Sequence, residues 1–339
     1  MTSLTTLHTN ILLLQTSIKA LSTKLDTILQ VPTASSILLF TQSSKGKGRD
    51  KNDSSNKQRE KILETLLGPE TAKLIEDPTY GAQWRTLHTA WKGALEQLAV
   101  IKGYTHYTDI KVESKGGRGY NYDYLVQYSG AGEAKVEFKF GGTSVSTLPE
   151  FFNPDANKPF QPVKYAEFFY DRYLDSVLSV YELPKTDKPS KEVYLKHIHS
   201  NSSSLPFFKT LYDKEKSDGA EKYKAKAAIS HTSIQEYLRL YGASTDLALL
   251  TSEFQRSQSG KTFLLYQDGV FHIDQIKDEE LIAQSVIGVQ GDSLLIQSAA
   301  PGTVHKMLLR WKNHHCVLLP AWQISMIRKS AAPTLTPSC

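Results

Sequence analysis

Glu137 and Lys139 lie two residues apart in a segment, AKVEFKFGG, in which apolar and charged residues alternate. Successive side chains of a β-strand point to opposite faces, so this pattern predicts a strand that buries Val136, Phe138 and Phe140. The carboxylate and the ammonium then share the opposite face, where they could act together on a substrate. A solvated charged face is the alternative that the segment by itself leaves open.

Asp123 stands fourteen residues before Glu137, in the strand-like segment NYDYLVQY. A short hairpin closes such a gap and would bring the two carboxylates side by side. Adjacent carboxylates repel unless a cation lies between them, and hard oxygen ligands favour Mg²⁺ or Mn²⁺, which also accept phosphate oxygens. The three residues therefore suit phosphodiester hydrolysis.

A carboxylate on one strand and Glu-x-Lys on the next resembles the PD-(D/E)xK superfamily of restriction-endonuclease-like nucleases. The resemblance covers about residues 82–200, and Tyr122 stands where the motif's name has Pro. It implies that Asp123 and Glu137 bind the metal, with the backbone carbonyl of Phe138 as a further ligand. It also implies that Lys139 orients or deprotonates the attacking water, and that the substrate is DNA.

Two further features bear on this resemblance. The segment KGALEQLAVIKGY is similar to the first helix of resolvase-like and exonuclease-like members, which implies that Glu96 joins the metal site. Glu96 lies roughly 100° beyond the apolar stripe of that helix, so a solvated surface residue is the alternative. The turn SKGGRGY places Lys115 and Arg118, with Lys111 before it, where they could bind nucleic acid, although a solvated hairpin fits equally well.

The hydrophobic periodicity predicts a helix, three strands, a helix and a strand. These elements are expected at residues 82–101, 104–113, 120–128, 134–140, 164–181 and 192–199. A helical stretch (205–248) and a β-rich tail (262–326) follow, the tail with a hairpin that turns at Asp268-Gly269. The predicted fold class is α/β, with a restriction-endonuclease-like core, an N-terminal heptad helix and a helical and β-rich C-terminal region.

Four regions are expected along the chain. Residues 1–41 begin with Leu and Ile at alternating spacings of three and four, which predicts a heptad-patterned helix that either pairs two copies as a coiled coil or packs on its own domain. Residues 42–61 carry no apolar side chain and are interpreted as a flexible basic linker. Residues 62–200 would form the nuclease core, and residues 201–339 an accessory DNA-binding or specificity region.

The composition favours a soluble protein that binds a polyanion and excludes a disulfide-rich one. Forty Lys and Arg against 35 Asp and Glu give a net charge of +5, which suits a protein that binds a polyanion. The cysteines are Cys316 and Cys339, too few for a disulfide framework or a four-thiolate zinc site. We expect a soluble intracellular protein, in nucleus or cytoplasm, because no apolar run approaches the roughly eighteen residues of a membrane span and the N-terminus does not read as a signal peptide.

Two other motifs are set aside. Gly260-Lys261-Thr262 resembles the end of a phosphate-binding loop, but Gln255 occupies the position of the first Gly. His314, His315 and Cys316, with His197 and His199, lack the paired spacing of a zinc site.

Three functions stay open on these grounds. The complete set of Asp, Glu and Lys favours a Mg²⁺-dependent endonuclease acting on DNA. A structure-specific nuclease for junctions or flaps would use the same residues. A non-catalytic nucleic-acid-binding or assembly protein on the same fold is the alternative from another class.

Overall fold

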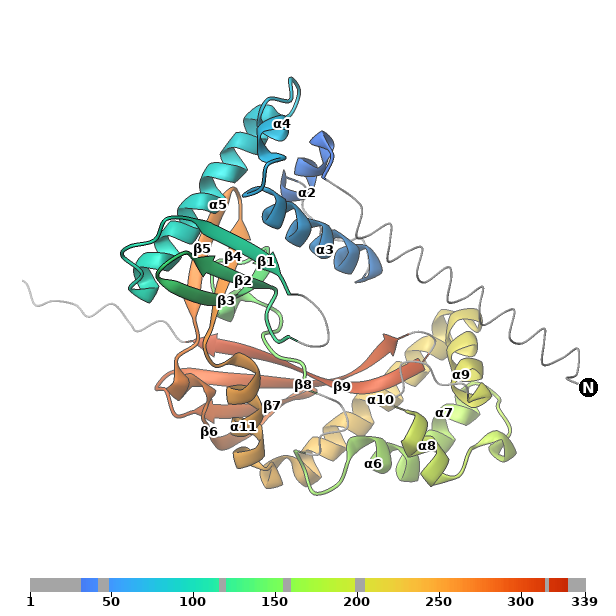
Figure 1. Ribbon diagram of the computed structural model, residues 1–339. Coiled ribbons are helices and arrows are strands. Elements are labelled where there is room, and N and C mark those ends of the chain that lie inside the picture. Colours follow the sequence, from blue (N-terminus) through green and yellow to red (C-terminus); the bar gives the residue numbers. More distant parts are fainter. Residues whose placement is uncertain are drawn as a thin grey trace, which may run out of the picture. The chain divides into compact units, whose positions relative to one another are not determined.

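The computed structural model describes residues 32–41, 49–115, 120–154, 160–198, 205–314 and 317–328 (Figure 1). The predicted heptad helix lies outside the described residues up to position 31, and so does Arg118. Within these ranges, no helix combines the length and the apolar character that crossing a membrane requires.

The chain forms two compact units. Unit 1 consists of Met1–Phe140 together with Tyr266–His272, and unit 2 of Gly141–Leu265 together with Ile273–Cys339. The structure therefore divides the chain near residue 140, and not at the predicted boundary between 62–200 and 201–339. The protein is of the mixed α/β class, with one five-stranded and one four-stranded sheet among the described residues.

Helices make up the first part of unit 1. They are η1 (Ala34–Ile37), α2 (Leu38–Thr41), α3 (Arg49–Thr65), α4 (Thr71–Ile75) and α5 (Gly81–Lys102). The helix predicted at 82–101 is confirmed by α5, which ends at Gly103 in the left-handed conformation (φ 74°) that glycine adopts without a steric cost. Its buried side chains, among them Trp84, Trp91 and Leu98, recur at helical spacing and form one apolar face.

The linker predicted at residues 42–61 is wrong from residue 49 onward, because α3 begins there. Arg59, Ile62, Leu63 and Leu66 are all buried and lie on one helical face, at spacings of three, one and three. Arg59 occupies an apolar position of this stripe. Its guanidinium lies 3.7 Å from the centre of the Phe140 ring and donates to a backbone carbonyl, which makes its burial tolerable.

The five-stranded sheet contains the predicted three strands as β1 (Ile110–Ser114), β2 (Tyr124–Tyr128) and β3 (Gly132–Phe140), which are antiparallel. Its strand order is β1-β2-β3-β4-β5, where β4 is Lys261–Gln267 and β5 is Val270–Gln275. Asp268 and Gly269 both have positive φ, which confirms the predicted hairpin turn. The tip of this hairpin belongs to unit 1.

Helix α5 packs on one face of this sheet (Figure 1). The Tyr128 hydroxyl donates to the Leu95 carbonyl (2.7 Å), and the ring of Trp91 lies 6.0 Å from that of Tyr124 and 5.1 Å from that of Phe271. The buried sheet residues share this face by strand alternation: Tyr124, Val126, Tyr128, Ala134, Val136 and Phe138. On β1, β2 and β3 the residues of the other face are polar or charged, apart from Leu125.

Unit 2 is rich in helices. They are η2 (Val145–Thr147), α6 (Tyr165–Arg172), α7 (Leu174–Val180), η3 (Lys185–Asp187), α8 (Lys191–His197), α9 (Pro206–Ser217), α10 (Gly219–Tyr241), η4 (Gly242–Ser244), α11 (Leu247–Gln258) and η5 (Asp278–Leu281). The strand predicted at 192–199 is wrong, because α8 occupies that segment. The Ser190 hydroxyl caps α8 by accepting from Val193, and Tyr194 and Ile198, four residues apart, are both buried.

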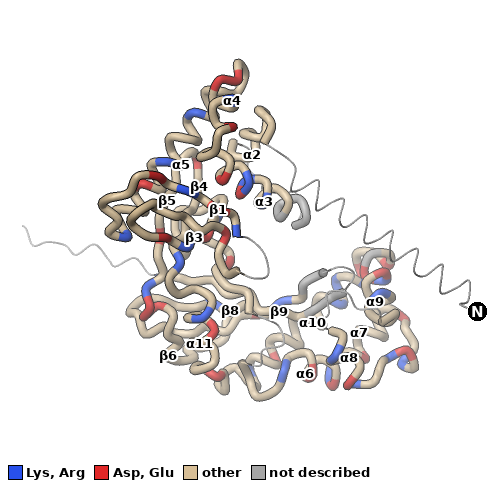
Figure 2. The backbone as a smooth tube through the Cα atoms, viewed as in Figure 1, with Lys and Arg blue, Asp and Glu red and all other residues tan. Residues whose placement is uncertain are grey.

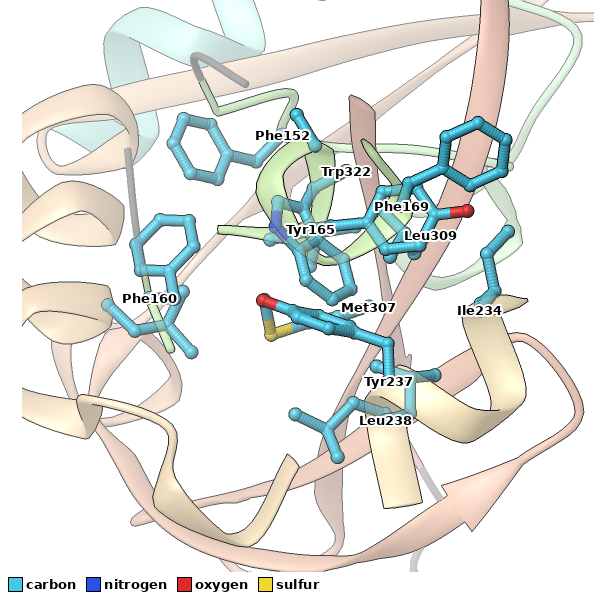
Figure 3. Close-up of a cluster of buried hydrophobic side chains, with 14 of the residues drawn as sticks. Phe152, Phe160, Tyr165, Phe169, Ile234, Tyr237, Leu238, Met307, Leu309 and Trp322 are labelled. Carbon is cyan, nitrogen blue, oxygen red and sulfur yellow. The ribbon is translucent and has the colours of Figure 1, made fainter. Parts of the chain in front are cut away.

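The second sheet has the order β6-β7-β8-β9, with every neighbouring pair antiparallel. Its strands are β6 (Ala283–Gln290), β7 (Ser293–Ser298), β8 (Thr303–His314) and β9 (Val317–Arg328). Figure 3 shows its core, in which Tyr165 and Phe169 from α6, Tyr237 from α10 and Met307 from β8 meet. The aromatic residues of 164–181 are thus largely core, and the C-terminal β-rich region is confirmed.

Candidate active site on the open face of the unit 1 sheet

Glu137 and Lys139 lie on β3 as the alternation predicts. Val136 and Phe138 are buried against α5, whereas the Glu137 and Lys139 side chains retain 15% and 35% of their exposed surface on the opposite face. The Lys139 ammonium contacts the Glu137 carboxylate at 2.5 Å, from Nζ to Oε1. The shared face is therefore confirmed, and the two groups form an ion pair.

Asp123 directly precedes β2 and faces β3. Tyr124 is opposite Val136 in the register, and the Asp123 amide donates to the same Val136 carbonyl (2.9 Å), which holds Asp123 beside β3 where the β2–β3 ladder begins. The Asp123 Oδ2 atom accepts from the Phe138 amide (2.8 Å). The predicted pairing of these two strands is confirmed. Both Asp123 and Glu137 act on the Lys139 ammonium, so the two carboxylates lie near the same group.

Glu60 is a third carboxylate of this site, which the sequence analysis missed. It lies in α3, and its backbone carbonyl accepts from the Tyr124 hydroxyl (2.8 Å), while Glu64 one turn later accepts from the Ser114 amide (3.1 Å). These two bonds hold α3 against the ends of β1 and β2. Burial, with the nearby charges of Asp123 and Glu137, raises the pKa of Glu60 to about 7, although Lys139 opposes the shift.

The site holds more negative than positive charge. Burial lowers the pKa of Lys139, but the carboxylates of Glu137, Asp123 and Glu60 outweigh it, so the pKa lies above its usual value and the ammonium stays charged. Burial, with the charges of Glu60, Asp123 and Glu64, keeps the pKa of Tyr124 well above its usual value, so its hydroxyl remains a donor. Among the groups that act on Glu60 and Lys139, the three carboxylates Glu60, Asp123 and Glu137 thus outnumber the two ammonium groups Lys139 and Lys57, a charge imbalance that a bound cation would relieve.

The chemistry of these donors fits a hard divalent cation. Within the described ranges, no three His, Cys, Asp or Glu side chains stand close enough to form a ready-made metal cage. Here Glu137 contacts Lys139, and Asp123 accepts from an amide. Mg²⁺ is commonly held by one or two carboxylates plus waters and substrate phosphates, so Asp123 and Glu137 would suffice as the protein ligands of such an ion.

Glu96 is not brought to this cluster. It lies on the exposed side of α5, with half of its side-chain surface exposed, and is 3.9 Å from the Lys92 ammonium. The charges that act on Glu60 and Lys139 come from one another, Asp123, Glu137 and Lys57, and not from Glu96. Glu60, and not Glu96, is thus the helical carboxylate that lies near Asp123, Glu137 and Lys139.

Of the three residues predicted to bind nucleic acid, Lys115 lies next to the site. Lys111 is exposed on β1, and Lys115 follows that strand, with its ammonium paired to Glu113. The Lys115 amide donates to the Asp123 carbonyl (2.7 Å), which sets it next to the metal-binding candidate. Arg118 lies outside the described residues.

Basic and acidic residues are interspersed along the tube in Figure 2, in both units. The site is therefore not distinguished by a broad surface of one charge, and any preference for a polyanion would have to come from residues close to the site. No family model, curated protein or solved structure matches this chain.

Proposed function

We propose that this chain is a metal-dependent nuclease that hydrolyses phosphodiester bonds of DNA. The observation that carries the proposal is a half-buried ammonium, Lys139, set among three carboxylates on the open face of a sheet. Partly buried groups whose pKa values are shifted by one another are typical of catalytic sites. An ion pair that served only stability would not require the two further carboxylates.

Asp123 and Glu137 would hold Mg²⁺ or Mn²⁺, with the Phe138 carbonyl as a further ligand. When bound, the cation supplies Lewis acidity that polarises the scissile phosphate and lowers the pKa of a water. Glu137 lies in β3, and Asp123, one residue before β2, is held against β3 by two hydrogen bonds: its amide donates to the Val136 carbonyl and its carboxylate accepts from the Phe138 amide.

Lys139 would position the attacking water and offset the charge that develops at phosphorus. Its ammonium stays charged because Glu137 and Asp123 surround it. Glu60, whose pKa is about 7, exchanges a proton near neutral pH and would accept the proton that the water releases.

The proposed core is restriction-endonuclease-like in its first half, where α5 is followed by β1, β2 and β3. The strand next to β3 in the sheet is β4, at residues 261–267, and not the segment at 192–199. In this proposal the core is completed late in the chain, and most of unit 2 is an insertion that serves DNA binding or specificity. Pairing of two copies through residues 1–41 stays a prediction.

A non-catalytic nucleic-acid-binding or assembly protein is the second candidate. The ion pair between Glu137 and Lys139 favours it, because the ammonium already neutralises one proposed metal ligand. In the nuclease, Glu137 must turn part of its carboxylate toward the cation. Metal-dependent cleavage separates the two candidates.

The test is cleavage of supercoiled plasmid by the full chain with Mg²⁺, with an EDTA control. Asp123→Asn and Lys139→Met should each lower the rate about 100-fold or more, since each removes charge stabilisation of the transition state. Glu96→Gln is the matched control and should leave the rate unchanged, because Glu96 lies on the exposed side of α5. Equal rates for wild type and Asp123→Asn would refute the nuclease.

A further inference from the structure

Two tyrosines lie beside the proposed active site, Tyr120 exposed and Tyr122 half-buried. Just over half of Tyr120 is exposed, and its ring centre lies 5.5 Å from that of Tyr122 at an angle of 60°. Tyr122 directly precedes Asp123 in the chain. An edge-to-face pair of this kind holds the rings in place without burying Tyr120, so the exposed ring is a preorganised surface.

Each ring has a lysine over it. The Lys115 ammonium lies 5.4 Å from the centre of Tyr120, and the Lys135 ammonium lies 5.7 Å from that of Tyr122. Both distances are within the range of a cation–π interaction. Lys115 is also paired with Glu113, whereas Lys135 has no carboxylate partner within the part of the chain that the structure describes.

The pair of rings and the active-site charges share one face of the sheet. Lys135 lies two residues before Glu137 on β3, and strand alternation sets both side chains on the face away from α5. Lys135 is paired in the register with Leu125 of β2, and Leu125 follows Asp123 by two residues. A nucleotide strand that crosses the carboxylates would therefore meet an ammonium and an aromatic ring within a few residues.

We propose that Tyr120, Tyr122, Lys115 and Lys135 form a binding site for unpaired nucleobases on a phosphate backbone. The bases stack on the exposed ring of Tyr120, and the lysines contact the phosphates. Aromatic rings next to lysines bind single strands in this way, because every base has a face that stacks. In a duplex the base faces are covered by their neighbours, so the site selects unpaired strands.

This inference rests on the proposed function for its link to cleavage: the substrate would be a single strand, or a junction or flap with unpaired bases. The site itself is a separate claim. Binding measured in EDTA, without cleavage, tests it independently of the nuclease.

The experiment is fluorescence anisotropy of the full chain with three labelled probes of equal length: oligo-dT, oligo-U and a mixed-sequence DNA duplex. Wild type should bind oligo-dT at least about tenfold more tightly than the duplex. Tyr120→Ala should weaken oligo-dT binding about tenfold, the effect expected for one stacked base. Tyr120→Phe should restore binding, because it keeps the ring. Comparable binding of oligo-U would extend the site to RNA, with the same dependence on Tyr120.

Tyr223→Ala is the matched control, because Tyr223 on α10 is exposed to almost the same extent as Tyr120 and lies in the other unit. It should bind like wild type. The inference is overturned if Tyr120→Ala binds oligo-dT as tightly as wild type does, or if the duplex binds best. If Tyr120→Ala still cleaves plasmid and binds oligo-dT like wild type, the base-binding site is refuted and the nuclease proposal is not. If oligo-dT binding depends on the Tyr120 ring but no metal-dependent cleavage occurs, the nuclease proposal is refuted and the base-binding site is not.

Discussion

Each unit of the protein contains a cluster of partly buried charges, and the two clusters are balanced differently. In unit 2, Arg328 donates to both oxygens of Asp274 and to both oxygens of Glu280, at 2.7 to 2.9 Å. In unit 1, the Lys139 ammonium lies among Glu60, Asp123 and Glu137, and Lys57 also acts on Glu60. The guanidinium meets each carboxylate with paired bonds, whereas burial and the neighbouring carboxylates leave Glu60 with a pKa near 7.

The difference separates a cluster that stabilises a fold from one that suits a function. The Arg328 cluster joins β9 to β5 and η5, and its bonds leave little capacity for a ligand. In the Lys139 cluster, burial and the neighbouring carboxylates raise the pKa of Glu60 to about 7, so this group takes up a proton near neutral pH. Such imbalance costs stability and is expected where chemistry requires it.

The largest expected effect on stability is that of breaking the balanced cluster. Arg328→Met keeps much of the volume but leaves Asp274 and Glu280 without their cation. We expect a loss of about 3 kcal/mol in the free energy of unfolding, measured by urea denaturation. Lys92→Met is the control: Lys92 also lies near a carboxylate, that of Glu96, but the two side chains are 56% and 50% exposed, so the variant should lose under about 1 kcal/mol. Equal losses for the two variants would contradict the contrast.

In the Lys139 cluster, Glu60→Gln should raise the free energy of unfolding, whereas Arg328→Met lowers it. The folded-state pKa of Glu60, about 7, lies above its usual value of 4.5, so its contribution to stability falls as pH rises from about 4.5 to 7. In EDTA the variant should be more stable than wild type by about 2 kcal/mol at pH 8. At pH 5 the two should be nearly equal.

Glu96→Gln serves as the control for this pH dependence, because Glu96 is an exposed residue of α5. Its difference from wild type should not change between pH 5 and pH 8. If Glu60→Gln shows no pH-dependent gain, Glu60 does not share charge with Asp123 and Lys139.

Mg²⁺ should give the smallest of these effects. Cation and proton compete for the same carboxylates, so Mg²⁺ should raise the melting temperature more at pH 8 than at pH 6. At a Mg²⁺ concentration of about ten times its dissociation constant, the gain is about 1.4 kcal/mol. Asp123→Asn should abolish the gain, and an identical gain in that variant would show that Mg²⁺ binds elsewhere.

The residues of the cluster differ in how well the sequence predicts their positions. For Glu137 and Lys139, the alternation of apolar and charged residues along β3 is enough to predict that they share one face. Asp123 needed the hairpin register, which followed from strand length and the intervening turn. Glu60 was missed because Arg59 occupies an apolar position of the α3 stripe. Ile62, Leu63 and Leu66 were the available signal that the helix extends toward the N-terminus.

The prediction of a strand at residues 192–199 was wrong for a different reason. Val193, Tyr194 and Leu195 have high β-propensity, which favoured a strand. The Ser190 cap and the burial of Tyr194 with Ile198 favour a helix, and tertiary packing decides between the two. Neither the partner of β3 in the sheet nor the division of the chain near residue 140 could be read from local pattern, because both depend on contacts between distant segments.

The hairpin tip at Tyr266–His272 has a consequence for synthesis on the ribosome. Phe271 packs against Trp91 and Phe138 and completes the core of unit 1, yet it is translated about 130 residues after Phe140. At roughly 5–20 residues per second, unit 1 waits about 6 to 26 seconds for its last segment. Its open sheet edge is exposed during that interval, so a nascent chain stalled before residue 266 should be more prone to aggregation than one released after residue 272.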